Sequence, residues 1–147
     1  MRWFPALALT FALLLPALPA RAEISVHNAW VRATVGTGRP TAGYAEIENT
    51  GPADDVLVSV RTTVAAMAGV HQTVSEGGIM KMEPVAALPV PAGKVTKLEP
   101  GGYHIMIMDV IKPLKAGDTV DMTFTFKKQG PLKVTAKIAP LAAQKMP

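Results

Sequence analysis

Hydrophobic and polar residues alternate over short runs along most of the chain, and Gly, Pro and Asp bound these runs. Such alternation is typical of half-buried β-strands, whose side chains point to opposite faces in turn. No segment has the longer apolar period of an amphipathic helix. We therefore predict nine strands, over residues 24–34, 42–49, 55–62, 66–73, 78–84, 95–98, 103–111, 119–127 and 132–139.

The clearest strand is 119–127, whose apolar side chains share one face: Val120, Met122, Phe124 and Phe126. The segment 127–131 contains the glycine that a tight hairpin needs, so this strand should pair antiparallel with 132–139. Short strands near ten residues apart, without helices for crossovers, predict an all-β, antiparallel Greek-key β-sandwich, with a barrel as the alternative. We expect 84–91 to be an extended loop and 141–147 a loose tail.

The first 22 residues have the pattern of a secretory signal peptide. Arg2 supplies the positive start, residues 4–18 are apolar, and Ala20-Arg21-Ala22 fits a cleavage site. A membrane anchor is the alternative, but three prolines interrupt the stretch and it is shorter than a spanning helix needs. We expect cleavage after Ala22, location in the periplasm, and one domain over residues 23–147.

Composition excludes several classes of function. Loss of Arg2 and Arg21 would reduce the net charge from +4 to +2, and the remaining lysines are scattered, so we do not expect nucleic-acid binding. The chain has no cysteine, which excludes disulfides and any thiolate ligand or nucleophile. We see no catalytic triad or close acid pair, since the adjacent Asp54 and Asp55 would point to opposite faces of a strand. We therefore do not expect an enzyme.

Histidine and methionine carry the candidate chemistry. In His104-Ile105-Met106 the first and third side chains point to the same face of a strand, about 6.6 Å apart at the backbone. Met80 and Met82 share a face in the same way, and the spacing does not distinguish them. Met108 would lie about 13 Å from His104, too far for the same ion.

The remaining histidine and methionines have simpler interpretations. His27 has no methionine two residues away, so we expect it to be structural or on the surface. We interpret Met67, Met108 and Met122 as adaptable core residues.

The softness of these donors predicts the metal. Thioether sulfur and neutral imidazole suit Cu(I), whereas zinc prefers thiolate, imidazole or carboxylate and calcium binds only oxygen. A blue-copper electron carrier would need a cysteine. We therefore expect bound Cu(I) without redox cycling.

Four residues complete a known pattern. His71 is followed by ten residues and Met82, then by twenty-one residues and His104-Ile105-Met106. This spacing, together with residues 77–85, 100–108 and 113–118, resembles the periplasmic copper chaperone family called PCuAC from residue 30 onward. The resemblance implies a cupredoxin-like β-sandwich with four Cu(I) ligands: His71, Met82, His104 and Met106.

The family also implies a function. Its members are implicated in supplying copper to the binuclear copper site of cytochrome c oxidase, so the expected partner is subunit II of that oxidase or another copper chaperone. The alternative is a protein that sequesters copper without a dedicated acceptor. The chain departs from relatives in having Gln72 and Thr73, where a methionine often follows the first histidine. Its tail has a single methionine, Met146, whereas some relatives end in a Met- and His-rich extension proposed to bind additional copper, so we do not expect a second bound copper.

Overall fold

The computed structural model describes residues 23–146, which form ten β-strands and contain no helix. The strands are β1 (Ile24–Arg32), β2 (Thr41–Asn49), β3 (Asp55–Thr62), β4 (Ala65–Glu76), β5 (Ile79–Pro84), β6 (Leu88–Val90), β7 (Lys94–Leu98), β8 (Tyr103–Val110), β9 (Thr119–Phe126) and β10 (Gly130–Ala139). The expected signal peptide at 1–22 lies outside the described residues. Within 23–146, no helix offers the length and apolar character required to cross a membrane.

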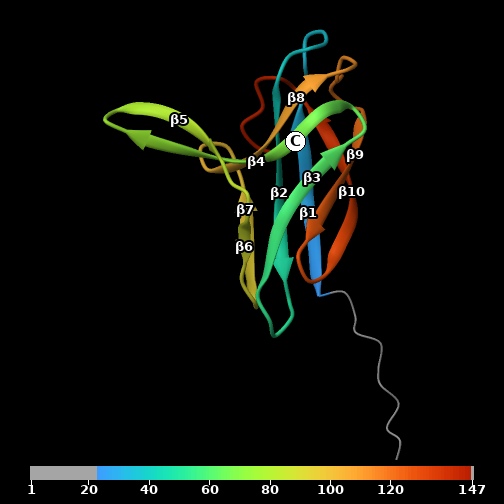
Figure 1. Cartoon of the computed structure of the whole chain (residues 1–147). Helices are drawn as coiled ribbons and strands as arrows, with labels where there is room; N and C mark the ends of the chain where they lie inside the picture. The colour runs from blue at the N-terminus through green and yellow to red at the C-terminus, as the bar shows by residue number, and fades with distance from the viewer. Residues whose placement is uncertain (1–22, 147) are drawn as a thin grey trace, which may run out of the picture.

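Hydrogen bonds join the strands in the order β5-β4-β8-β2-β1-β10-β9-β3-β6, and β7 pairs with β2 beside this path. The sheet curls over, so that β3 passes in front of β1 and β2 (Figure 1). The prediction of an all-β sandwich is confirmed. The pairing is not wholly antiparallel, however, because β1 and β10 run parallel at Trp30 to Arg32.

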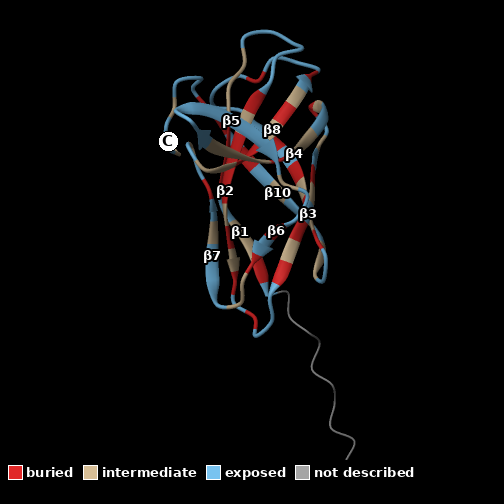
Figure 2. Cartoon of the chain, turned by 60° about the vertical axis from the view of Figure 1, so that its left-hand side comes forward, coloured by how far each residue is buried: buried red, intermediate tan, exposed pale blue. Residues whose placement is uncertain are grey.

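One apolar cluster fills the interior, and buried residues recur along the strands of the body, whereas β5 is exposed (Figure 2). Its largest fully buried side chains come from six strands and one loop: Val31, Ile47, Leu57, Val60, Leu88, Val90, Ile105, Ile107, Leu114, Met122, Phe124 and Phe126. Burying each such side chain contributes about 1.5–3 kcal/mol. This packing provides the rigid frame on which the outer faces of the strands are displayed.

The β9–β10 hairpin confirms the clearest sequence pattern. Val120, Met122, Phe124 and Phe126 are all buried, and Asp121 between them is exposed. Gly130 faces Phe126 across the turn with a φ of 85°, a left-handed conformation that glycine adopts without steric cost.

The prediction of a loop over 84–91 is wrong in part, because Leu88–Val90 forms β6. Its central residue, Pro89, cannot donate a ladder hydrogen bond, and the strand lies at the end of the sheet order beside β3. Edge strands tolerate proline because one side needs no partner. A three-residue edge strand with a proline gives too weak a pattern to recognise from the sequence.

The methionines divide between core and surface. Met122 is fully buried, as predicted, and Met108 is partly buried. The prediction for Met67 is wrong, because its side chain is 53 % exposed. The physical reason is that Met67 lies on the outer face of β4, which no other layer covers at that point.

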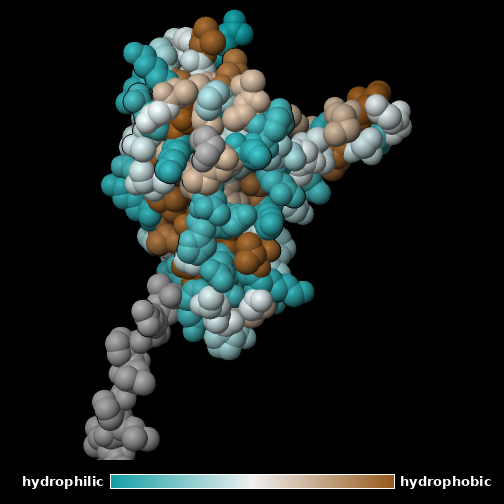
Figure 3. Space-filling model, turned by 180° about the vertical axis from the view of Figure 1, so that it is seen from behind, coloured by the Kyte–Doolittle hydropathy of each residue, from teal (hydrophilic) through white to brown (hydrophobic). Residues whose placement is uncertain are grey.

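β4 and β5 form a hairpin that projects from the body of the domain, and we call residues 74–81 the arm (Figure 1). β5 is exposed along its whole length. Apolar side chains nevertheless occur on it, since Ile79, Met80 and Met82 are each more than half exposed. From behind, apolar atoms are visible at the end of this projection (Figure 3).

Candidate functional site

Strand register brings the four predicted ligands to one region. His71 of β4 lies directly opposite His104 of β8. Met106 lies two residues further along β8, opposite Gly69. Met82 of β5 lies opposite Thr73, which is on the same face of β4 as His71. The four side chains therefore share one face of three adjacent strands.

That face is the outer one. Val70 and Ile105, the paired neighbours of the two histidines, are both buried in the core. Because side chains alternate along a strand, His71 and His104 must point away from the core. The hydrophobic pattern of β4 and β8 thus positions both imidazoles.

His104 is a buried polar side chain with an unused nitrogen. Only 4 % of the residue is exposed. Its Nδ1 lies 3.2 Å from the carbonyl oxygen of Gly102, and since a carbonyl can only accept, Nδ1 carries the proton. Nε2 is then a bare acceptor, and it has no hydrogen-bond partner among residues 23–146. An unpartnered buried polar atom costs about 1–3 kcal/mol, so this nitrogen calls for an explanation.

His71 has the same arrangement at lower burial. Its Nδ1 lies 3.3 Å from the carbonyl oxygen of Gly69, which again leaves Nε2 as the free acceptor. The ring centres of His71 and His104 are 6.2 Å apart and their planes differ by 27°. Metal–imidazole bonds are about 2 Å long, so rings at this separation are close enough for one ion to bind both.

Three of the four residues line one pocket of about 280 Å³. The pocket is lined by Arg32, Ala42, Tyr44, Thr73, Met82, Pro100, Gly101, His104, Met106 and Gln144. His71 instead lines a separate hollow of about 350 Å³ with Pro84 and Val85. It is near the other three residues because its ring centre lies 6.2 Å from that of His104.

The pocket contains no carboxylate, and residues 23–146 hold no cluster of three or more His, Cys, Asp or Glu side chains that could bind a metal. Two imidazole nitrogens and two thioether sulfurs are neutral, soft donors. This is the donor set that Cu(I) prefers and that Mg²⁺ or Ca²⁺ would not accept.

Arg32, Tyr44 and the tail form one wall of the pocket, and the sequence did not indicate their role. The guanidinium of Arg32 lies 5.3 Å from the ring centre of Tyr44, and its Nε donates to the carbonyl of Ala143 at 2.9 Å. Burial raises the pKa of the Tyr44 phenol, and the nearby Arg32 charge partly counters this.

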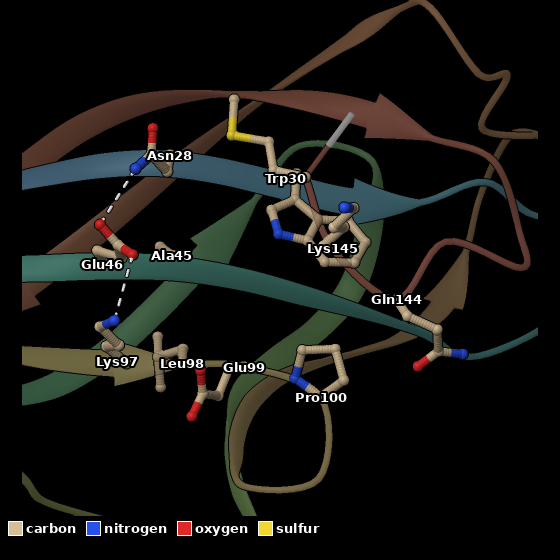
Figure 4. A pocket seen from close by; sticks show the side chains of 11 residues that line it. Asn28, Trp30, Ala45, Glu46, Lys97, Leu98, Glu99, Pro100, Gln144 and Lys145 are labelled. Carbon is tan, nitrogen blue, oxygen red and sulfur yellow. Dashed lines mark hydrogen bonds and ion pairs between the residues drawn. The ribbon is translucent and has the colours of Figure 1, made fainter.

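The tail also closes an adjoining pocket of about 460 Å³ that shares Pro100 and Gln144 with the candidate site (Figure 4). There Lys145 lies beside Trp30. The carboxylate of Glu46 accepts a hydrogen bond from Asn28 at 3.1 Å and forms an ion pair with Lys97 at 3.9 Å. The expectation of a loose tail is thus wrong, since Met146 and Ala143 pack against a small apolar cluster around Trp30.

The remaining candidates lie elsewhere. His27 is on the surface, where its Nε2 is 3.2 Å from a carboxylate oxygen of Glu48 and 2.8 Å from the hydroxyl of Ser25. Met80 faces Ser75 on the arm, two residues further from the body than Met82. The carbonyls of Gly69 and Gly102, which orient the histidine rings, have no signal in the sequence because every residue has a carbonyl.

The chain is similar to known proteins in sequence and in fold. The chain is 35 % identical over 118 residues to Putative lipoprotein Lxx21020 of Leifsonia xyli subsp. xyli, covering 74 % of this chain and 70 % of that protein. Its fold matches the apo PCuAC domain from PmoF1 with a TM-score of 0.68 at 26 % identity, covering 80 % of this chain and 94 % of the domain. It matches Cu(I)-bound DR1885 from Deinococcus radiodurans with a TM-score of 0.64 at 31 % identity, covering 84 % and 80 %.

The family model named LpqE-like matches residues 24–138, which include all four predicted ligands. The structural neighbours confirm the resemblance to PCuAC domains that the spacing of His71, Met82, His104 and Met106 indicated. The chain therefore belongs to the LpqE-like family and has the cupredoxin-like fold of PCuAC domains.

Proposed function

We propose that this protein is an exported, non-enzymatic carrier that binds one Cu(I) ion through His71, Met82, His104 and Met106 and passes it to an acceptor protein. The single observation that carries the proposal is the buried, unpartnered Nε2 of His104 in a pocket that also holds two thioethers and no carboxylate. A bound soft cation would accept the lone pair of that nitrogen, whereas the nitrogen of a purely structural histidine would be expected to have a hydrogen-bond partner.

The similarity to DR1885, whose solution structure contains Cu(I), supports this choice of metal. The name of the Leifsonia relative, a lipoprotein, supports export. For this chain we propose location in the periplasm after cleavage behind Ala22. The proposed acceptor is the binuclear copper site of cytochrome c oxidase subunit II, or another copper chaperone that supplies it.

The exposure of the ligands suggests how copper could leave. Met82 is 58 % exposed and belongs to β5, which is exposed throughout and pairs only with β4. His104, by contrast, is buried. A neutral thioether is a weak ligand, so a thiolate of the acceptor would displace Met82 first, and the transfer would run toward the stronger sulfur donor.

X-ray absorption on the Cu(I)-loaded protein tests the ligand set. Wild type should show two sulfur and two nitrogen neighbours, and Met82→Ala and Met106→Ala should each lose one sulfur. Met80→Ala is the matched control, because Met80 is similarly exposed but lies further out on the arm. An unchanged sulfur count in both test variants would contradict the proposal.

Deletion of the gene tests delivery separately from binding. Loss of a carrier should lower cytochrome c oxidase activity when copper is scarce, and added copper should restore it. Sensitivity to excess copper with normal oxidase activity would instead indicate sequestration without a dedicated acceptor.

A further inference from the structure

The outer face of β4 and β8 carries a second group of thioethers beyond the histidine pair. Met67 of β4 lies directly opposite Met108 of β8. This pair is two residues beyond the Gly69–Met106 pair, on the side away from the histidines. Residues directly opposite in an antiparallel pair have Cβ atoms about 5 Å apart, and side chains two residues apart on a strand are separated by about 6.6 Å. Three long, flexible thioether side chains, Met67, Met106 and Met108, thus start from adjacent points on one surface.

Packing does not account for the placement of these residues. Met67 is 53 % exposed, and Met106 and Met108 are only partly buried. All three are on the opposite face from Ile105 and Ile107, which fill the core. An exposed apolar pair contributes little to stability, and β-branched residues would suit a strand better than methionine.

The surface leaves room for the Met106 side chain to move between the histidine pair and the Met67–Met108 pair. Its partner on β4 is Gly69, and a side chain built at Gly69 would meet nothing within 4 Å. Its partner on β2 is Ala42, the smallest side chain after glycine. Met106 therefore has open space on the Gly69 side, between His71 and Met67, and its sulfur can turn toward His104 or toward Met108.

We propose that Met67, Met106 and Met108 form a second Cu(I) site, which receives the ion before it reaches the histidines. Three neutral thioethers bind Cu(I) more weakly than a set with two imidazoles, so the ion moves toward His104. Met106 stays bound during this step, the bonds from copper to the sulfurs of Met67 and Met108 break, and bonds form to the two imidazole nitrogens and to the sulfur of Met82. Copper remains Cu(I) throughout, and no proton or electron is transferred.

The proposal extends the copper-carrying function, but a test without the histidines separates the two. In the variant His71→Ala/His104→Ala, with methionine methyl groups labelled with ¹³C, anaerobic addition of Cu(I) should shift the methyl signals of Met67, Met106 and Met108. The signals of Met80 on the arm and Met122 in the core should not move. Adding Met67→Leu and Met108→Leu should abolish the remaining binding, whereas adding Met80→Leu should leave it unchanged.

The outcomes distinguish the two proposals. Binding in wild type but none in the double-histidine variant would overturn the second site and leave the first intact. Binding that survives Met67→Leu and Met108→Leu would also overturn it. No binding even in wild type would overturn the copper function itself. Should the histidine variant fail to fold, loading kinetics of otherwise wild-type protein test the same point: Met67→Leu/Met108→Leu should slow Cu(I) uptake and leave the final affinity unchanged, whereas Met80→Leu should change neither. An unchanged uptake rate would overturn the second site.

Discussion

Asp55 and His104 are both buried polar residues in an apolar sandwich, at 5 % and 4 % exposure, but only one of them is satisfied. The Asp55 carboxylate accepts hydrogen bonds from the backbone N–H groups of Val56, Lys128 and Gln129 at 2.7–2.9 Å. The Nε2 of His104 accepts none. Asp55 thus joins the start of β3 to the β9–β10 turn, whereas His104 keeps a lone pair available.

The pKa of Asp55 shows the same contrast in electrostatic terms. Burial by itself raises this pKa, but the three N–H donors and the charge of Lys128 outweigh it, so the pKa lies below its usual range. The comparison shows that burial alone does not identify a functional residue. A buried polar group with every partner in place stabilises the fold, and one that lacks a partner calls for an explanation, which we propose is a bound ion.

The largest expected effect comes from pH, which should act on the two residues in separate windows. Both imidazoles must be unprotonated to bind a metal, so protons compete with Cu(I) and its affinity should fall as the pH is lowered from about 7.5 to about 5. The stabilisation from Asp55 should persist over that range. Because its folded pKa is lowered, the contribution is present above the unfolded value of about 3.9 and is lost as pH falls through the folded value. Competition titrations and urea unfolding across pH measure the two quantities, and a flat copper affinity would contradict histidine ligation.

Replacing His104 should separate binding from stability. His104→Leu should lower Cu(I) affinity at least about 100-fold, since even changes to groups behind the ligands cost 10–100-fold. The free energy of unfolding without copper should change by less than about 1 kcal/mol, because an apolar side chain removes the unpartnered nitrogen. Chelator competition and denaturant unfolding on one preparation measure both. A large loss of stability would mean that His104 is structural.

Asp55→Asn should have the opposite profile. An amide cannot satisfy three converging N–H donors as a carboxylate does, so the free energy of unfolding should fall by about 1–3 kcal/mol. Copper affinity should stay within about twofold of wild type. Urea unfolding measures the loss, and Asp118→Asn is the control because Asp118 is exposed. Equal losses in the two variants would refute the structural role of Asp55.

The smallest effect is expected at Met82. Met82→Leu should lower Cu(I) affinity about tenfold, since one thioether of four ligands is lost, and stability should not change because the residue is more than half exposed. Release of copper to a thiol competitor should also become faster. Met80→Leu should change neither quantity, and an equal effect of both variants would show that Met82 has no special position.

Much of the fold was predictable because the buried residues of strands such as β9 are apolar and alternate with polar ones. Strands such as β3 and β9 were located to within one residue, since Val120, Met122, Phe124 and Phe126 alternate with polar residues. β6 was missed because an edge strand with Pro89 lacks that alternation. The parallel pairing of β1 with β10 was missed because hydrophobic patterning specifies which face is buried and not which strand is the neighbour.

The sequence by itself determined the chemical identity of the candidate site. Two imidazoles and two thioethers at fixed spacings, in a chain without cysteine, define a soft donor set wherever they meet. Only the tertiary structure decided that they do meet, and that Gly69 and Gly102 orient the rings while Arg32 and the tail enclose the pocket. It also revealed the exposed Met67 opposite Met108. The physical reason is that donor chemistry belongs to single side chains, whereas convergence, orientation and burial depend on strand register between segments distant in the chain.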